Sequence, residues 1–311
     1  CNMIKVNVLK PGDGVALVAP ASPFKKVDFD RGVEELRRLG LKPLYNDSVF
    51  SRSGYLAGTP EVRARAIQEA WNNPDVSAIL GVRGGYGSVQ VLSFLEPQEA
   101  IRAQKPFIGY SDLTSILIYL TSVCGMTCFH GPMLCGGLSK EVSGYDETTF
   151  IKSLMSTEPL GELEVQALET VKDGDASGVL LGGTLTQILP SLSTPFAFNP
   201  PDGYVLFVDE IGERPYRIDR LLTQFRLSGL LQRASAVVFG ELPGCDEPSG
   251  LLTSRGVVDA VMADFNGPVL FGLPSGHATV PSITLPLGVR ARVIGGGKPR
   301  IILEESAVKE R

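Results

Sequence analysis

Histidine is scarce in this sequence, since only His130 and His277 occur among its 311 residues. Any mechanism that uses histidine as a general base therefore has two candidates. Tryptophan is scarcer still, and the single Trp71 offers little of the aromatic surface on which nucleotide bases stack. Positive charge is also in deficit, because 34 acidic residues outnumber 29 basic ones. The net charge of −5 argues against nucleic-acid binding, which usually needs a basic face.

Long apolar runs and a disulfide framework are missing as well. No apolar stretch reaches the roughly 18–20 residues that span a bilayer, and residues 1–5 lack a basic segment followed by an apolar one. We therefore expect no membrane association and no export signal. The five cysteines are odd in number, which argues against disulfides in a chain of this size. Cys124, Cys128 and Cys135 surround His130, but their spacing does not fit a paired zinc pattern, so we expect buried thiols and no metal.

What remains is typical of a well-packed protein. Hydrophobic residues make up 43% of the chain and charged residues 20%, which favours a folded core over disorder. A chain of 311 residues has room for two domains or one large one.

Apolar runs typical of strands alternate with helical spacing in the first half of the chain. We expect strands within 14–22, 41–45, 76–82 and 106–108, and helices at 29–39 and from Thr59 to about Trp71. Strands that alternate with helices predict an α/β fold with a parallel sheet covered on both faces. Ligands bind at the carboxyl ends of the strands in such sheets.

The pattern changes near Ser156. We place an N-terminal domain at residues 1–156, a linker at about 157–175 and a mixed α+β domain at 176–311. In that second domain we expect strands at 204–208, 236–239, 289–294 and 300–303, and helices at 217–227 and 253–265.

One stretch, Pro106-Phe-Ile-Gly-Tyr-Ser-Asp-Leu-Thr114, joins an apolar strand end to a helix-like run through a glycine. A strand that turns abruptly into a helix lifts one side chain clear of the sheet and points free N–H groups at the ligand. This is the geometry of a nucleophile elbow, with Ser111 at its apex. The alternative is that Ser111 or Asp112 only caps the helix.

A second glycine-rich stretch, Gly81-Val-Arg-Gly-Gly-Tyr-Gly87, also follows an expected strand. Its spacing is not that of the dinucleotide-binding fingerprint. Gly84 and Gly85 allow backbone N–H groups to approach an oxyanion or a substrate carboxylate closely. A tight turn between a strand and a helix explains the glycines equally well.

A serine nucleophile needs a base, and the two histidines differ in their surroundings. His277 lies in a loop of glycine and proline, whereas His130 lies against an apolar run, as structural histidines do, so we favour His277 as the base. A buried carboxylate at a strand end then orients the imidazole. Asp209 and Glu210 are the candidates, and as neighbours on a strand they point to opposite sides, so only one can face His277.

Several motifs together resemble the LD-carboxypeptidase (muramoyltetrapeptide carboxypeptidase) family, the serine peptidases of the S66 type. They lie at 82–88, 109–114, 129–133, 207–220 and 276–288. Their order and spacing match over nearly the whole chain.

The resemblance implies a Ser–His–Glu triad with Ser111 as nucleophile and His277 as base. It also implies oxyanion donors from the backbone N–H groups of Asp112 and Gly85. The implied architecture is a Rossmann-like N-terminal domain, a smaller β-rich C-terminal domain and an active site at their junction.

The implied activity is that of a serine carboxypeptidase without a cofactor. The family cleaves the bond between an L-configured diamino-acid centre and a terminal D-alanine in cytoplasmic murein tetrapeptides, a step of peptidoglycan recycling. Its members are commonly dimers, so the resemblance implies a cytoplasmic homodimer that acts on a small peptide.

Two positions depart from the family pattern. The family acid is usually Glu followed by Asp, whereas here Asp209 precedes Glu210. Asp209 occupies the sequence position of the family acid, whereas Glu210 has the side-chain length of the family acid. We give the sequence position more weight and favour Asp209. The chain also has Gly182-Gly-Thr184 where relatives often carry Asn, which affects local substrate contacts.

Two other functions compete with this interpretation. One is a microcin-immunity-like hydrolase of peptidyl nucleotides, which needs an aromatic platform for a base. The other is a murein-peptide binding protein without activity, against which the presence of both Ser111 and His277 argues.

Overall fold

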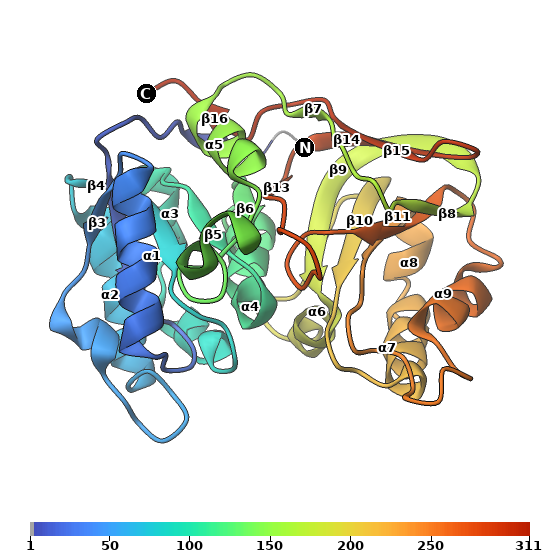
Figure 1. The fold of residues 1–311 in the computed structure, drawn as a ribbon, viewed down its shortest axis with the longest axis horizontal. Coiled ribbons are helices and arrows are strands. Elements are labelled where there is room, and N and C mark those ends of the chain that lie inside the picture. Colours follow the sequence, from blue (N-terminus) through green and yellow to red (C-terminus); the bar gives the residue numbers. More distant parts are fainter. Residues whose placement is uncertain (1–2) are drawn as a thin grey trace.

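The computed structural model describes residues 3–311, which form a two-domain α/β fold with two main β-sheets side by side (Figure 1). In Figure 1 the N-terminal half of the chain lies on the left and most of the C-terminal half on the right. Cys1 lies outside the described residues.

The first sheet is six-stranded and is built mainly from the N-terminal half. Its order is β13 (Leu285–Leu287), β6 (Cys128–His130), β5 (Phe107–Gly109), β4 (Val76–Gly81), β2 (Gly14–Val18) and β3 (Lys42–Leu44). Neighbouring strands from β6 to β3 pair in parallel, as the alternating pattern predicted. At one edge, β13 comes from the far end of the chain and pairs antiparallel to β6.

Helices cover this sheet and connect its strands. They are α1 (Lys26–Arg38), α2 (Pro60–Asn72), α3 (Pro97–Ala103), α4 (Thr114–Ile118) and α5 (Glu147–Met155). The start of α2 is fixed by its sequence, because the Thr59 hydroxyl accepts a hydrogen bond from the Val62 amide and Pro60 occupies the first turn.

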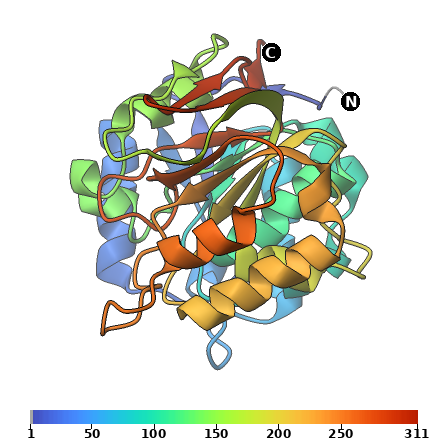
Figure 2. The same ribbon diagram turned by 90° about the vertical axis from the view of Figure 1, so that its right-hand side faces the viewer.

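The second sheet is eight-stranded and parallel at its centre. Its order is β7 (Gly161–Glu162), β15 (Arg300–Leu303), β14 (Arg290–Gly295), β9 (Gly174–Thr184), β10 (Tyr204–Asp209), β11 (Ala234–Gly240), β12 (Val269–Leu273) and β8 (Glu169–Lys172). The parallel strands are β9 to β12, and the outer pairings are antiparallel. Helices α6 (Leu185–Ser191), α7 (Pro215–Leu227), α8 (Leu230–Arg233) and α9 (Ser254–Met262) pack beside this sheet (Figure 2).

The two ends of the described chain also meet. β1 (Val6–Asn7) pairs in parallel with β16 (Val308–Lys309). Residues 157–175, which the sequence analysis treats as a linker, contain the short strands β7 and β8 and the start of β9.

Within residues 3–311 four cysteines are free and buried, as expected: Cys124, Cys128, Cys135 and Cys245. Burial raises the pKa of all four thiols, to about 12 for Cys124 and Cys135 and to about 11 for Cys245, so they stay protonated at neutral pH. Across residues 3–311, every helix is too short or too polar to traverse a bilayer. The same residues contain no group of three or more acidic, histidine or cysteine side chains placed to hold a metal ion.

Candidate active site

Ser111 stands on a sharp turn between β5 and α4. Tyr110 is fully extended, with φ of −155°, and Ser111 then takes a left-handed φ of 60° before a short 3-10 turn leads into α4. A non-glycine residue with positive φ is uncommon and strained, and such strain gathers at functional sites. The structure therefore places Ser111 at the apex that the elbow geometry predicted.

His277 and Asp209 form a hydrogen-bonded pair at the carboxyl end of the second sheet. Asp209 is the last residue of β10 and is fully buried, while His277 lies in the loop between β12 and β13. The Nδ1 atom of His277 lies 2.8 Å from Oδ2 of Asp209, and the backbone N–H of His277 donates to Oδ1 at 3.2 Å. This contact assigns the proton to Nδ1 and leaves Nε2 of His277 free to accept one.

The charge of Asp209 prepares His277 to take up a proton. Burial disfavours the charged imidazole, but the hydrogen bond to Asp209 and its negative charge outweigh burial and raise the pKa of His277 above its usual value. The ring of Tyr110 lies edge-on against the His277 ring, with centroids 5.1 Å apart. The residue before Ser111 therefore contacts the imidazole, which brings Ser111 and His277 into one site.

His130 lies near the same carboxylate oxygen as His277. Its Nε2 atom is 3.7 Å from Oδ2 of Asp209 and has no hydrogen-bond partner within residues 3–311, while Nδ1 contacts the Ser275 hydroxyl at 2.9 Å. Complete burial lowers the pKa of His130 to about 4, so this imidazole is neutral at neutral pH. Sequence reasoning treated His130 as structural and did not anticipate its contact with Asp209.

Glu210 points away from His277, toward the start of α6. Its Oε2 atom accepts the Thr186 amide at 2.9 Å, and its Oε1 atom accepts the Ile211 amide at 3.2 Å. The carboxylate thus caps the first turn of α6, where amide groups lack partners within the helix. Burial raises the pKa of Glu210 to about 7.

Threonines connect these elements, a feature that sequence reasoning missed. The Thr184 hydroxyl donates to Oδ2 of Asp209 at 3.3 Å, and the Thr184 amide donates to the Thr114 hydroxyl at 3.1 Å. Thr114 begins α4, three residues after Ser111. Hydrogen bonds through Thr184 therefore connect the start of α4, just after Ser111, to Asp209.

The glycine loop completes the site. Gly84 lies against Ser111, since a β-carbon on Gly84 would stand 3.1 Å from the Ser111 β-carbon. Gly85 has a φ of +97°, and no hydrogen bond among residues 3–311 uses its amide as a donor. The Asp112 side chain is fully buried, and its carboxylate accepts the Ser88 amide at 2.8 Å, which holds the end of the glycine loop in place. The backbone amide of Asp112 lies in the turn that begins at Ser111.

Comparisons with known proteins agree with this geometry. The family model described as the LD-carboxypeptidase N-terminal domain matches residues 15–131, and that of the LD-carboxypeptidase C-terminal domain matches 177–293. A probable murein peptide carboxypeptidase from Bacillus subtilis is 30% identical over 98% of this chain and 96% of its own. A murein tetrapeptide carboxypeptidase from Pseudomonas aeruginosa is 32% identical over 86% of this chain and 89% of its own. Among solved structures, MccF in complex with glutamyl sulfamoyl guanosine superimposes with a TM-score of 0.90 at 23% identity, over 98% of this chain and 100% of that one, which shows a shared fold.

Proposed function

The chain belongs to the LD-carboxypeptidase family of peptidases, and we propose that it hydrolyses the LD-peptide bond to the terminal D-alanine of murein tetrapeptides. Ser111 is the nucleophile, His277 the base and Asp209 the acid of the proposed triad. The observation that carries this proposal is the 2.8 Å contact of His277 with buried Asp209, beside the strained turn of Ser111.

The proposed reaction assigns one chemical step to each of these groups. The Ser111 hydroxyl attacks the carbonyl carbon of the scissile bond and passes its proton to Nε2 of His277. The N–H groups of Gly85 and Asp112 stabilise the oxyanion that forms. His277 then protonates the leaving amine of D-alanine, which leaves an acyl ester on Ser111. Water, deprotonated by His277, hydrolyses this ester and restores the enzyme.

The family resemblance also supports a finer proposal about organisation. We propose a cytoplasmic homodimer that acts in peptidoglycan recycling, with the nucleophile on residues 1–156 and the acid and base on 176–311, joined by 157–175. Each of the two regions has its own sheet, although β13 of the second region extends the sheet of the first. Light scattering of the purified protein measures the molar mass that distinguishes a dimer from a monomer.

The decisive experiment is incubation with murein tri-, tetra- and pentapeptides, followed by detection of free D-alanine. We expect release from the tetrapeptide and none from the tripeptide, which lacks the terminal residue. Absence of D-alanine from all three peptides, with a folded protein, contradicts the proposed substrate.

One observation favours a second candidate, a hydrolase of peptidyl nucleotides. Trp71 is buried in α2 and cannot stack on a base, but Tyr55 and Tyr86 are exposed with ring centroids 6.0 Å apart. Tyr86 follows Gly85, so this aromatic pair lies next to the proposed oxyanion donor. Turnover of a glutamyl sulfamoyl nucleoside that exceeds turnover of the tetrapeptide would favour this candidate.

A further inference from the structure

A buried arginine outside the proposed triad holds the glycine loop. Arg63, in the first turn of α2, is only 2% exposed, and its guanidinium donates four hydrogen bonds. Nε donates to the Gly58 carbonyl at 3.0 Å, and Nη1 donates to the carbonyls of Pro20 at 2.6 Å and Gly87 at 2.7 Å. Nη2 donates to the side-chain oxygen of Gln90 at 2.6 Å.

These acceptors come from separate segments around the site. Pro20 follows β2, Gly58 precedes α2, and Gly87 and Gln90 lie at the end of the glycine loop and in the 3-10 helix after it. Burial lowers the pKa of Arg63 and the negative charge of Asp112 opposes this shift, but a guanidinium stays protonated in either case. Its charge-assisted hydrogen bonds therefore offset a large desolvation cost and tie the segments together.

One peptide unit lies between opposite charges. The carbonyl of Gly87 accepts from Nη1 of Arg63, and the N–H of the same peptide, on Ser88, donates to Oδ2 of Asp112 at 2.8 Å. The Ser88 hydroxyl donates to the Asp112 carbonyl at 2.6 Å. Gly87 is required here, because its φ is +125° and a β-carbon would stand 3.0 Å from Nη1 of Arg63.

This peptide connects the two proposed oxyanion donors. On one side the chain leads back two residues to Gly85, and on the other Asp112 adjoins Ser111. We propose that Arg63 is a positioning residue that fixes the Gly87–Ser88 peptide against Asp112 and so places the Gly85 and Asp112 N–H groups around the Ser111 hydroxyl. This inference rests on the proposed roles of those groups.

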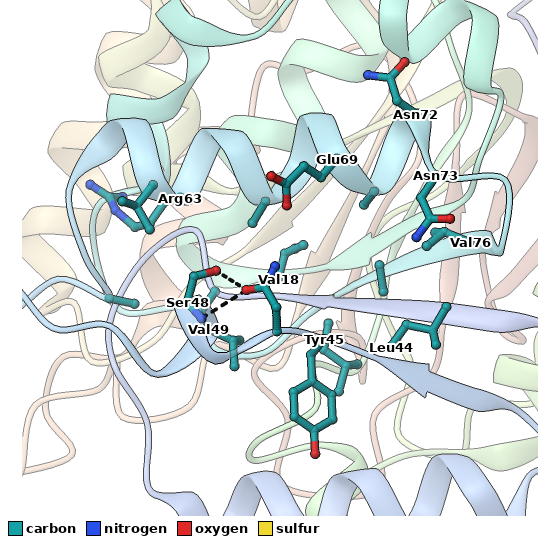
Figure 3. Close-up of a pocket in the computed structure, with 18 of the residues that line it drawn as sticks. Val18, Leu44, Tyr45, Ser48, Val49, Arg63, Glu69, Asn72, Asn73 and Val76 are labelled. Carbon is teal, nitrogen blue, oxygen red and sulfur yellow. Dashed lines mark hydrogen bonds between the residues drawn. The ribbon is translucent and has the colours of Figure 1, made fainter.

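A cavity beside Arg63 makes the inference testable. A space of about 600 Å³ lies between α2 and the strands β2 and β3, with Arg63 toward one end and Glu69 farther along the helix (Figure 3). The α2 part of its wall is mixed, with Val62, Ala66 and Ala70 beside Arg63, Glu69 and Asn72. Truncation of Arg63 to alanine extends this space toward the guanidinium position, so a small cation can enter and occupy it.

The experiment compares Arg63→Ala and Arg63→Lys with Arg65→Ala, which removes an exposed arginine from the same helix. Two rates are measured: kcat for D-alanine release, and labelling of Ser111 by a fluorophosphonate probe. We expect Arg63→Ala to lower both by about 10²-fold with little change in KM, because a misplaced donor affects the transition state more than substrate binding. Lysine restores only part of the rate, since it lacks the planar fork of donors, and Arg65→Ala matches the wild type.

Added methylguanidinium decides between positioning and general destabilisation. We expect it to raise the labelling rate of Arg63→Ala by about tenfold, while ammonium at the same concentration does not, because only the planar ion reproduces the donor geometry. A folded Arg63→Ala variant that labels at the wild-type rate overturns the inference, and so does a loss that methylguanidinium fails to restore.

Two further outcomes are also informative. Should Arg63→Ala fail to fold, the Lys variant decides: slowed labelling in a folded protein supports the inference, and wild-type labelling overturns it. Should the wild type be labelled at Ser111 but release no D-alanine, the proposed substrate is wrong, while the labelling rates still test Arg63.

Discussion

Protonation of Glu210 is expected to make folding stability depend on pH in a way that one substitution can isolate. The carboxyl is only 2% exposed, and its pKa is raised from 4.5 to about 7, chiefly by burial. The folded protein therefore binds this proton more tightly than the unfolded chain does. The stability contributed by the neutral carboxyl is fully present below pH 4.5 and is lost as the pH rises through about 7.

The magnitude follows from the two pKa values. A difference of about 2.5 in pKa corresponds to about 3 kcal/mol of unfolding free energy, at about 1.4 kcal/mol for each pH unit. His130 has the opposite effect, because burial lowers its pKa from 6.5 to about 4, and stability rises with pH across that range. The two contributions oppose each other in the wild type between about pH 4.5 and 6.5, so its own pH profile shows only their sum.

Glu210→Gln separates the contribution of Glu210 from that of His130, because glutamine resembles the neutral carboxyl at every pH and still accepts the Thr186 amide. Urea unfolding, followed by circular dichroism from pH 4.5 to 8, measures the unfolding free energy of both proteins. Relative to the wild type, the variant should gain about 3 kcal/mol between the two ends of this range. The same substitution at exposed Glu158 controls for the loss of one acidic side chain. A difference between Glu210→Gln and the wild type that stays constant with pH would refute the reasoning.

Five further substitutions test the proposed triad and its surroundings. Ser111→Ala should reduce D-alanine release by about 10³-fold or more with an unchanged melting temperature, and near-wild-type turnover contradicts a serine mechanism. His277→Ala should lower D-alanine release as much as Ser111→Ala does, and combining the two should lower it little further. His130→Ala should mainly lower the melting temperature. If His130→Ala abolishes turnover in a folded protein and His277→Ala does not, the roles of the two histidines are exchanged. Asp209→Asn should lower kcat strongly, and by more than Glu210→Gln does, with little effect on stability. If Glu210→Gln lowers kcat more than Asp209→Asn does, Glu210 is the acid. Gly276→Ala should lower both stability and kcat, because its β-carbon would stand 2.4 Å from Cε1 of His130 and 2.6 Å from Oδ2 of Asp209, and unchanged kinetics contradict this.

Much of the first sheet could be predicted, because each of its long strands is a continuous apolar run followed by a helix with its own start signals. Strand β13 could not, since Leu285-Pro-Leu287 is only three residues long and its partner β6 lies more than 150 residues earlier. A pairing between segments so far apart leaves no pattern in the sequence around either strand. Strand β9 was also missed, because four glycines and a polar first half interrupt the apolar run that marks a buried strand.

The candidate side chains could be predicted, but the orientation of the carboxylates could not. Alternation on a strand shows only that Asp209 and Glu210 face opposite sides. Which of the two faces His277 depends on where the other carboxylate finds hydrogen-bond donors. Here Glu210 accepts the Thr186 amide in the first turn of α6. The sequence before α6 reads Gly182-Gly-Thr184, which gives no sign that a glutamate from another strand caps this helix.

The surroundings of Asp209 explain why one buried negative charge suits the proposed reaction. The carboxylate is fully buried, and in the form of the site in which His277 can act as a base, its partners His277, Thr184 and His130 are uncharged. A buried charge with only neutral partners is costly. In the proposed reaction His277 takes the proton of Ser111, and the imidazolium that forms 2.8 Å from that carboxylate compensates its charge. His130 stays neutral because its pKa lies near 4, so it does not neutralise Asp209 before the reaction begins. The site is thus electrostatically better satisfied in the transition state than at rest, which is the condition for catalysis by a preorganised environment.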